Sequence, residues 1–146
     1  TFADAKIAAT GTVVEPDKAA LNKAIADAEA KLADGNRYTP DSLAALNTAL
    51  TKAKAAQSSS DQTAINAAAK ALNDAIAALR SYRLGDVDGD STVAAADALI
   101  ALQAANGALT LTADQALAAN VDGQAGVSVI DALMILHAAA GKITLG

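Results

Sequence analysis

The segment GDVDGDSTVAAAD, residues 85–97, concentrates carboxylates in a chain that is otherwise rich in alanine. A calcium ion takes six to eight oxygen ligands, and a loop can surround it with carboxylates at positions 1, 3, 5 and 12 and a backbone carbonyl at position 7. The residues that occupy these positions are Asp86, Asp88, Asp90, Asp97 and, at position 7, Thr92. Without a cation, each adjacent pair of carboxylates would repel by about 1 kcal/mol. The spacing therefore predicts a calcium site.

Two other interpretations of this segment remain open. An acidic turn could simply cap the helix that follows, because Asp and Gly favour turns and Asp favours helix N-caps. A pair of carboxylates could also cleave a glycosidic bond, but four carboxylates on one tight loop leave no cleft for a sugar. A second copy of the pattern favours calcium over both.

This second copy begins 34 residues later, at Asn120. The residues that align are Gly89 with Gly123, Val93 with Val127, Asp97 with Asp131, and Gly107 with Gly141. Such a repeat predicts two loop–helix units, and the valine at position 8 of both loops allows a short two-stranded bridge between them. Between the units, Thr112 and Gln115 have the spacing of a capping box, which predicts a short linking helix.

The excess negative charge is confined to the repeated region. Residues 1–82 hold nine basic and nine acidic residues, whereas residues 83–146 hold two basic and seven acidic ones, which accounts for the net charge of −5. An acidic region without a basic stripe argues against nucleic acid and membrane surfaces as partners. No apolar run reaches the roughly 18 residues of a membrane span. Cysteine is absent, which excludes disulfides and thiolate chemistry.

Three amphipathic helices are predicted before the acidic region, because apolar residues recur there every three or four positions. The first helix should begin after Pro16 and end near Gly35, and the second should begin at Pro40 with Thr39 as its N-cap. The third should run to about Arg80. The apolar stripes are Leu21, Ile25, Ala28 and Leu32, then Leu43, Leu46, Leu50 and Ala53, then Ile65, Leu72 and Leu79. Short connections predict an antiparallel bundle, and the fold class is all-α.

This bundle resembles a FIVAR module, a three-helix accessory domain of bacterial surface and secreted proteins. The resemblance covers residues 16–82 and rests on LNKAIADAEAKL, YTPDSLAALNTALTKAK and INAAAKALNDAIAAL. Where the family often has tryptophan after the YTxxS turn, this chain has Leu43. This difference weakens any ligand-binding role that would depend on an exposed indole.

Residues 84–146 resemble a dockerin domain, in which two calcium loops of the F-hand kind are each followed by a helix. The resemblance implies a second calcium site that is weaker or partly empty, because the side chains of its loop carry two negative charges rather than four. Its ligands would be Asn120, Asp122, Gln124 and Asp131 with the carbonyl of Gly126. At position 6 of the first loop, Ser91 replaces the usual glycine, which predicts some strain or weakened affinity.

Dockerins bind cohesin domains and so attach carbohydrate-active enzymes to extracellular assemblies. The family pattern places the partner-binding residues here at Ala95, Ala96, Leu102 and Gln103 in one repeat and at Val129, Ile130, Leu136 and His137 in the other. Leu102 and Leu136 could equally belong to the core. Val129 and Ile130 cannot both point inward, so we expect an exposed apolar patch there. We expect no catalytic role for His137.

The expected organisation is a connector (1–14), a FIVAR-like bundle (15–82) and a dockerin (83–146). We expect a mature product or fragment that is secreted or cell-surface associated and that is not itself an enzyme, although it is attached to a glycoside hydrolase. It should be a monomer until it binds a cohesin, with the bundle as a rigid spacer, since only about five residues join the bundle to Asp86. The alternative function is carbohydrate binding, for which Phe2, Tyr38 and Tyr82 are the only aromatic side chains.

Overall fold

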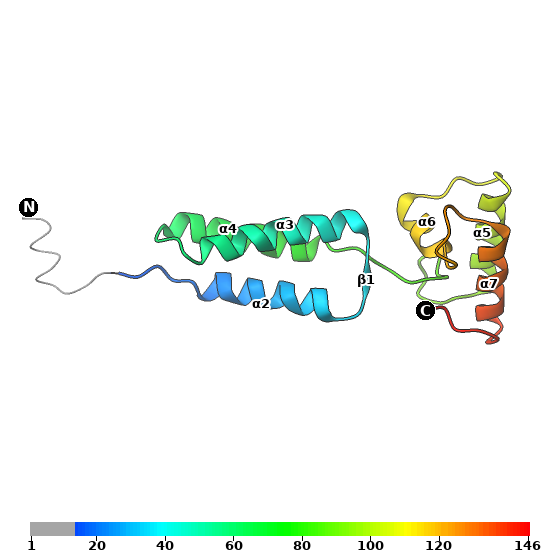
Figure 1. The fold of residues 1–146 in the computed structure, drawn as a ribbon, viewed down its shortest axis with the longest axis horizontal. Helices are drawn as coiled ribbons and strands as arrows, with labels where there is room; N and C mark the ends of the chain where they lie inside the picture. The colour runs from blue at the N-terminus through cyan, green and yellow to red at the C-terminus, as the bar shows by residue number, and fades with distance from the viewer. Residues whose placement is uncertain (1–13) are drawn as a thin grey trace, which may run out of the picture. The chain divides into compact units, whose positions relative to one another are not determined.

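The computed structural model describes residues 14–146, which divide into two compact units (Figure 1). One unit combines the residues up to 34 with residues 44–78, and the other combines residues 35–43 with residues 79–146. The described residues are mostly helical, as predicted. The elements are α2 (Ala19–Ala33), β1 (Arg37–Tyr38), α3 (Pro40–Ala56), α4 (Gln62–Ala77), β2 (Ser81–Tyr82), α5 (Ala95–Ala105), α6 (Ala113–Ala119) and α7 (Val129–Ala139). The expected connector lies, except for Val14, outside the described residues.

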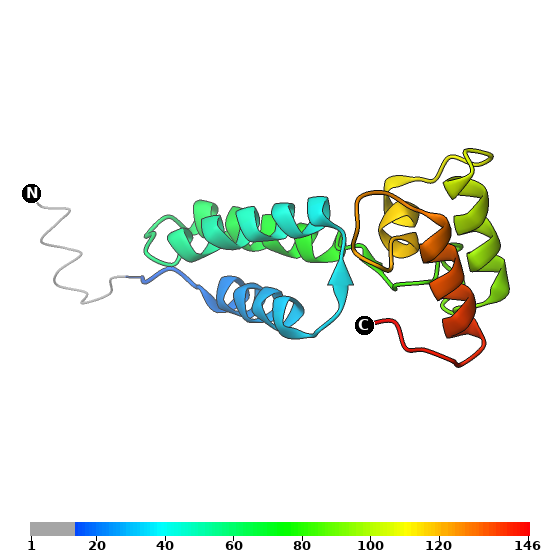
Figure 2. The ribbon, with the colours of Figure 1, turned by 45° about the vertical axis from the view of Figure 1, so that its right-hand side comes forward.

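Helices α2, α3 and α4 lie side by side as a bundle in both ribbon views (Figure 1 and Figure 2). Alanine favours the helical state throughout, and the apolar stripes predicted from the sequence meet in the centre. The buried residues are Leu21, Ala24, Ile25, Ala28, Leu46, Leu50, Ala53, Ile65, Ala69 and Leu72. The many alanines among them leave space for the helix backbones to approach closely. Leu32, which was also expected in this core, is instead 40% exposed.

The ends of the bundle helices show one error in the sequence-based prediction. Helix α2 ends just before Gly35, which has a φ of +76°, and α3 begins at Pro40, as expected. Helix α4, however, ends at Ala77 and not at Arg80, because the chain becomes extended and β2 pairs antiparallel with β1. Strands of two residues have no periodicity that a sequence pattern could reveal.

Helices α5 and α7 pack against each other and share one core with α6 and the two loops (Figure 2). The buried apolar residues of this core are Val87, Ala98, Ala101, Ala119, Ala132 and Ile135. The predicted linking helix is α6, whose Thr112 and Gln115 form the expected capping box with hydrogen bonds of 3.0 and 3.2 Å. Val93 and Val127 pack against the core. The two-stranded bridge expected between these valines does not form, because β1 and β2 are the only strands in the described part of the chain.

Candidate functional site

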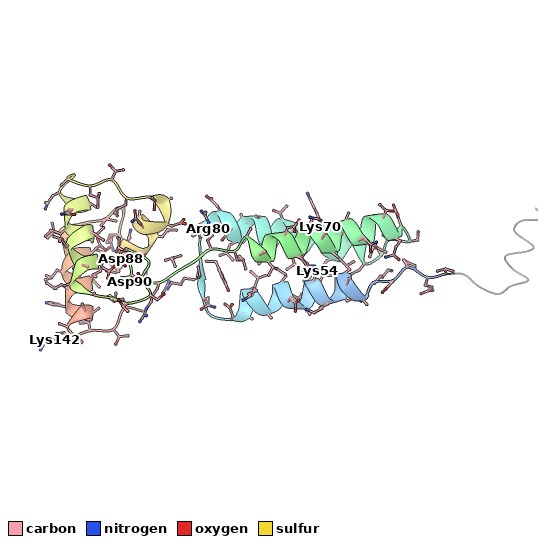
Figure 3. All side chains as sticks on the ribbon, turned by 180° about the vertical axis from the view of Figure 1, so that it is seen from behind. Lys54, Lys70, Arg80, Asp88, Asp90 and Lys142 are labelled. Carbon is pink, nitrogen blue, oxygen red and sulfur yellow. The ribbon has the colours of Figure 1, made fainter. Side chains whose placement is uncertain are left out.

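Three of the four aspartates of the first loop come together in space. One carboxylate oxygen from each of Asp86, Asp88 and Asp97 lies within 4.8 Å of the others, and these three form the only such group found among the described residues. Asp88 and Asp90 are labelled on this loop in Figure 3. Asp90 stands apart from the group, because its Oδ1 accepts hydrogen bonds from the hydroxyl (2.6 Å) and the backbone N–H (2.8 Å) of Thr92. These hydrogen bonds lower the pKa of Asp90.

Asp97 is fully buried and connects the loop to helix α5. Its place in the first turn of the helix brings the carboxylate back over the loop, as in a capping box. Oδ1 accepts the backbone N–H groups of Val87 (2.7 Å) and Asp88 (3.1 Å), and Oδ2 accepts that of Ala94 (2.8 Å). A buried charge is tolerated only when it is hydrogen-bonded in this way. One site on Oδ2 is left for a further ligand, since a carboxylate offers about four lone pairs.

The strain that the sequence predicts at position 6 of the first loop is confirmed. Ser91 has a φ of +74°, and it is the only residue other than glycine with a positive φ in the described part of the chain. This left-handed conformation costs a side-chain-bearing residue about 1 kcal/mol. The turn brings the Ser91 N–H within 3.0 Å of Asp86 Oδ2, while Gly89 N–H donates to Asp86 Oδ1 at 2.8 Å. The loop that contains the strained Ser91 is thus closed around Asp86 by two backbone hydrogen bonds.

In the second loop, the buried carboxylate of Asp131 repeats the role of Asp97. It accepts the N–H groups of Val121 (2.9 Å) and Asp122 (3.1 Å) and both the N–H and the hydroxyl of Ser128 (2.8 Å each). Burial raises the pKa of Asp131, but the hydrogen bonds from Asp122, Ser128 and Val121 outweigh this effect and leave the pKa below its usual value. Gln124 and Gly126 are exposed. Calcium binding by this loop stays a prediction.

An apolar surface lies on the outer side of α7. Val129, Ile130 and Leu136 are 54%, 61% and 44% exposed, so the expected patch is present and Leu136 is not a core residue. Leu133, 51% exposed, lies between them and was missed, although it follows Ile130 by three positions and Val129 by four. We call these four residues the α7 face. His137 is exposed beside them.

The equivalent surface of α5 has smaller side chains. Ala95, Ala96 and Gln103 are exposed, whereas Leu102 is half-buried and packs against the core. Leu99, the counterpart of Leu133, is 55% exposed and was also missed by the sequence analysis. The two repeats therefore present unlike outer surfaces.

Residues 17–80 match the FIVAR domain family, which confirms the resemblance of the bundle. FIVAR modules are non-catalytic accessory domains that occur in extracellular or surface proteins. No match was found among curated proteins or solved structures. None of the helices in residues 14–146 has the length and apolar character that crossing a membrane requires. The dockerin resemblance of residues 84–146 stays a prediction.

Proposed function

We propose that residues 83–146 are a calcium-dependent docking module of the dockerin kind that binds a cohesin domain. In this proposal the FIVAR bundle is the spacer, and the parent protein is a secreted enzyme that acts on carbohydrates and joins an extracellular assembly. The observation that carries the proposal is the α7 face, where four bulky apolar side chains are about half exposed next to an acidic loop region. Contiguous apolar surface of this kind marks a protein-binding site more often than a free surface.

The charge around this face indicates the chemistry of the partner. Residues 83–146 carry a net charge of −5, and the α7 face itself has no charged residue. Protein interfaces commonly combine an apolar centre with a charged rim of complementary sign. We therefore expect a cohesin that presents an apolar patch surrounded by basic side chains, and we expect association to slow as salt is added.

Calcium would act on the fold of the module. The carboxylates of Asp86, Asp88 and Asp97 would hold the ion, and the ion would neutralise their mutual repulsion. Asp97 also lies in the first turn of helix α5, and α5 packs against α7. Loss of the ion from the first loop would thus loosen α5 and, through the shared core, the support of the α7 face. This coupling would make partner binding depend on calcium.

The test is surface plasmon resonance of the full chain over a panel of immobilised cohesin domains, with calcium and with a chelator. Val129→Asp with Ile130→Asp should abolish detectable binding, because burial of these two side chains at an interface centre contributes about 2–4 kcal/mol. Both positions are in the first turn of α7, where an acidic residue suits the helix dipole, so the fold should survive.

The matched control is Ala95→Asp with Ala96→Asp at the equivalent positions of α5. This variant should bind more weakly than the unmodified chain but better than the α7 variant, because alanine buries less apolar area. The reverse order would show that α5 carries the contact. Failure to bind any cohesin, together with glycan binding by the same chain, would favour the carbohydrate-binding alternative.

A further inference from the structure

We infer that the second loop, residues 120–131, closes without a metal ion, so that each chain takes up a single calcium ion in the first loop. This inference rests on the proposed function and departs from the two sites that the dockerin resemblance implies. It comes from differences between the two loops at three equivalent positions.

The first difference is at position 1. Asp86 presents two carboxylate oxygens to the interior of its loop, and each accepts a backbone N–H. Asn120 instead accepts the N–H of Gly123 with Oδ1 (3.0 Å) and donates from Nδ2 to the backbone carbonyl of Gln124 (2.6 Å). The Gly123 N–H requires an acceptor and the Gln124 carbonyl requires a donor, so these two hydrogen bonds fix the orientation of the Asn120 side-chain amide. An N–H group therefore stands where the first loop has an anionic oxygen.

The second difference is in the backbone. Both loops have a left-handed glycine at position 4, Gly89 and Gly123. The further left-handed residue is Ser91 at position 6 in the first loop, whereas in the second loop it is Gly126, with a φ of +85°, at position 7. Position 7 is the one whose backbone carbonyl binds the ion in loops of this kind. A left-handed residue at that position changes the direction of the adjacent peptide planes. The Asn120–Gln124 hydrogen bond and this altered turn thus belong to one closed conformation.

The third difference is at position 12. Asp131 accepts two backbone N–H groups on Oδ1 and both the N–H and the hydroxyl of Ser128 on Oδ2. These four hydrogen bonds use all the lone pairs that a carboxylate offers. At the position of Ser128 the first repeat has Ala94, which supplies no hydroxyl, so Asp97 accepts only three hydrogen bonds. Asp97 keeps an acceptor site for a cation, and Asp131 does not.

The experiment is a calorimetric titration of the calcium-free full chain with calcium chloride, using the same substitution at position 3 of each loop. The unmodified chain and Asp122→Asn should both bind one ion with the same affinity. Asp88→Asn should bind at least about tenfold more weakly, because a charged ligand is lost. The amide NMR spectrum of each variant shows whether the variant is folded, so that a loss of binding is not confused with unfolding.

A second readout follows the amide signals of the two loops by NMR during the same titration. The Gly89 N–H and the Ser91 N–H should shift, while the side-chain amide of Asn120 and the N–H of Gly123 should keep positions typical of their hydrogen bonds. Two bound ions, or weaker binding in Asp122→Asn, would overturn the inference and leave the calcium-dependent function standing. Absence of any bound ion in the unmodified chain would contradict both.

Discussion

Replacement of Asp131 by alanine should strongly destabilise the second unit. The side chain is fully buried and accepts four hydrogen bonds, three of them from backbone N–H groups at the start of the loop and the start of α7. Each buried donor left without an acceptor costs about 1–3 kcal/mol. Some of these donors lie close to the surface and would gain water, so we expect Asp131→Ala to lower the free energy of unfolding by about 2–4 kcal/mol.

The assay is urea unfolding of the full chain in chelator, followed by the NMR methyl signal of Ile135, which reports on the second core alone. The control is Ser128→Ala, which removes the hydroxyl that donates to Asp131 and that caps α7 by accepting the N–H groups of Ile130 and Asp131, and it should cost about 1–2 kcal/mol. The first repeat begins α5 with Ala94 at this position, so the fold tolerates the change. A loss for Asp131→Ala no larger than for Ser128→Ala would refute the view that this carboxylate holds the loop to the helix.

Three further results are expected. Gly85→Ala should lower the free energy of unfolding of the second unit by about 1–2 kcal/mol, because Gly85 has a φ of +86° and an added Cβ would lie 2.5 Å from Leu145 Cδ1. The control is Gly123→Ala, because Gly123 has a φ of +72° but open space around it. Thermal melts of the two variants therefore separate the cost of the backbone conformation from the cost of the clash. Chelation should raise amide exchange in residues 84–146 and leave α2–α4 unchanged, and equal protection with and without chelator would contradict this. Leu133→Asp should weaken cohesin binding more than Leu99→Asp in plasmon resonance, and equal losses would place both helices in the contact.

The helices were predictable because their apolar residues follow the helical period and their ends carry strong local signals. Gly35, Pro40 and the capping box at Thr112 each stand where the structure ends or begins a helix. The two strands were not predictable, because they depend on a pairing between segments more than 40 residues apart that involves two residues on each side. Leu32 was misplaced because it lies in the last turn of α2, where the partner helices no longer cover it.

The candidate site was only partly predictable for a different reason. Spacing within a loop identifies which residues can reach a common point, and Asp86, Asp88 and Asp97 do so. Spacing does not reveal which lone pairs are already used by the backbone. The separation of Asp90 from the group and the hydrogen bond between Asn120 and Gln124 both arise from local backbone geometry. Leu99 and Leu133 were missed because the family pattern, and not the helical period, was used to choose the partner-binding residues.

The two repeats differ in complementary ways under these proposals. The first has the charged loop and small outer residues, Ala95 and Ala96, so it suits an ion better than a partner. The second has a loop that closes through Asn120 and bulky outer residues, Val129 and Ile130, so it suits a partner better than an ion. Because α5 and α7 share one core, an ion bound in one repeat can still control the surface of the other. A chain with one ion would therefore remain calcium-dependent in binding, and a single docking orientation would follow from the unlike faces.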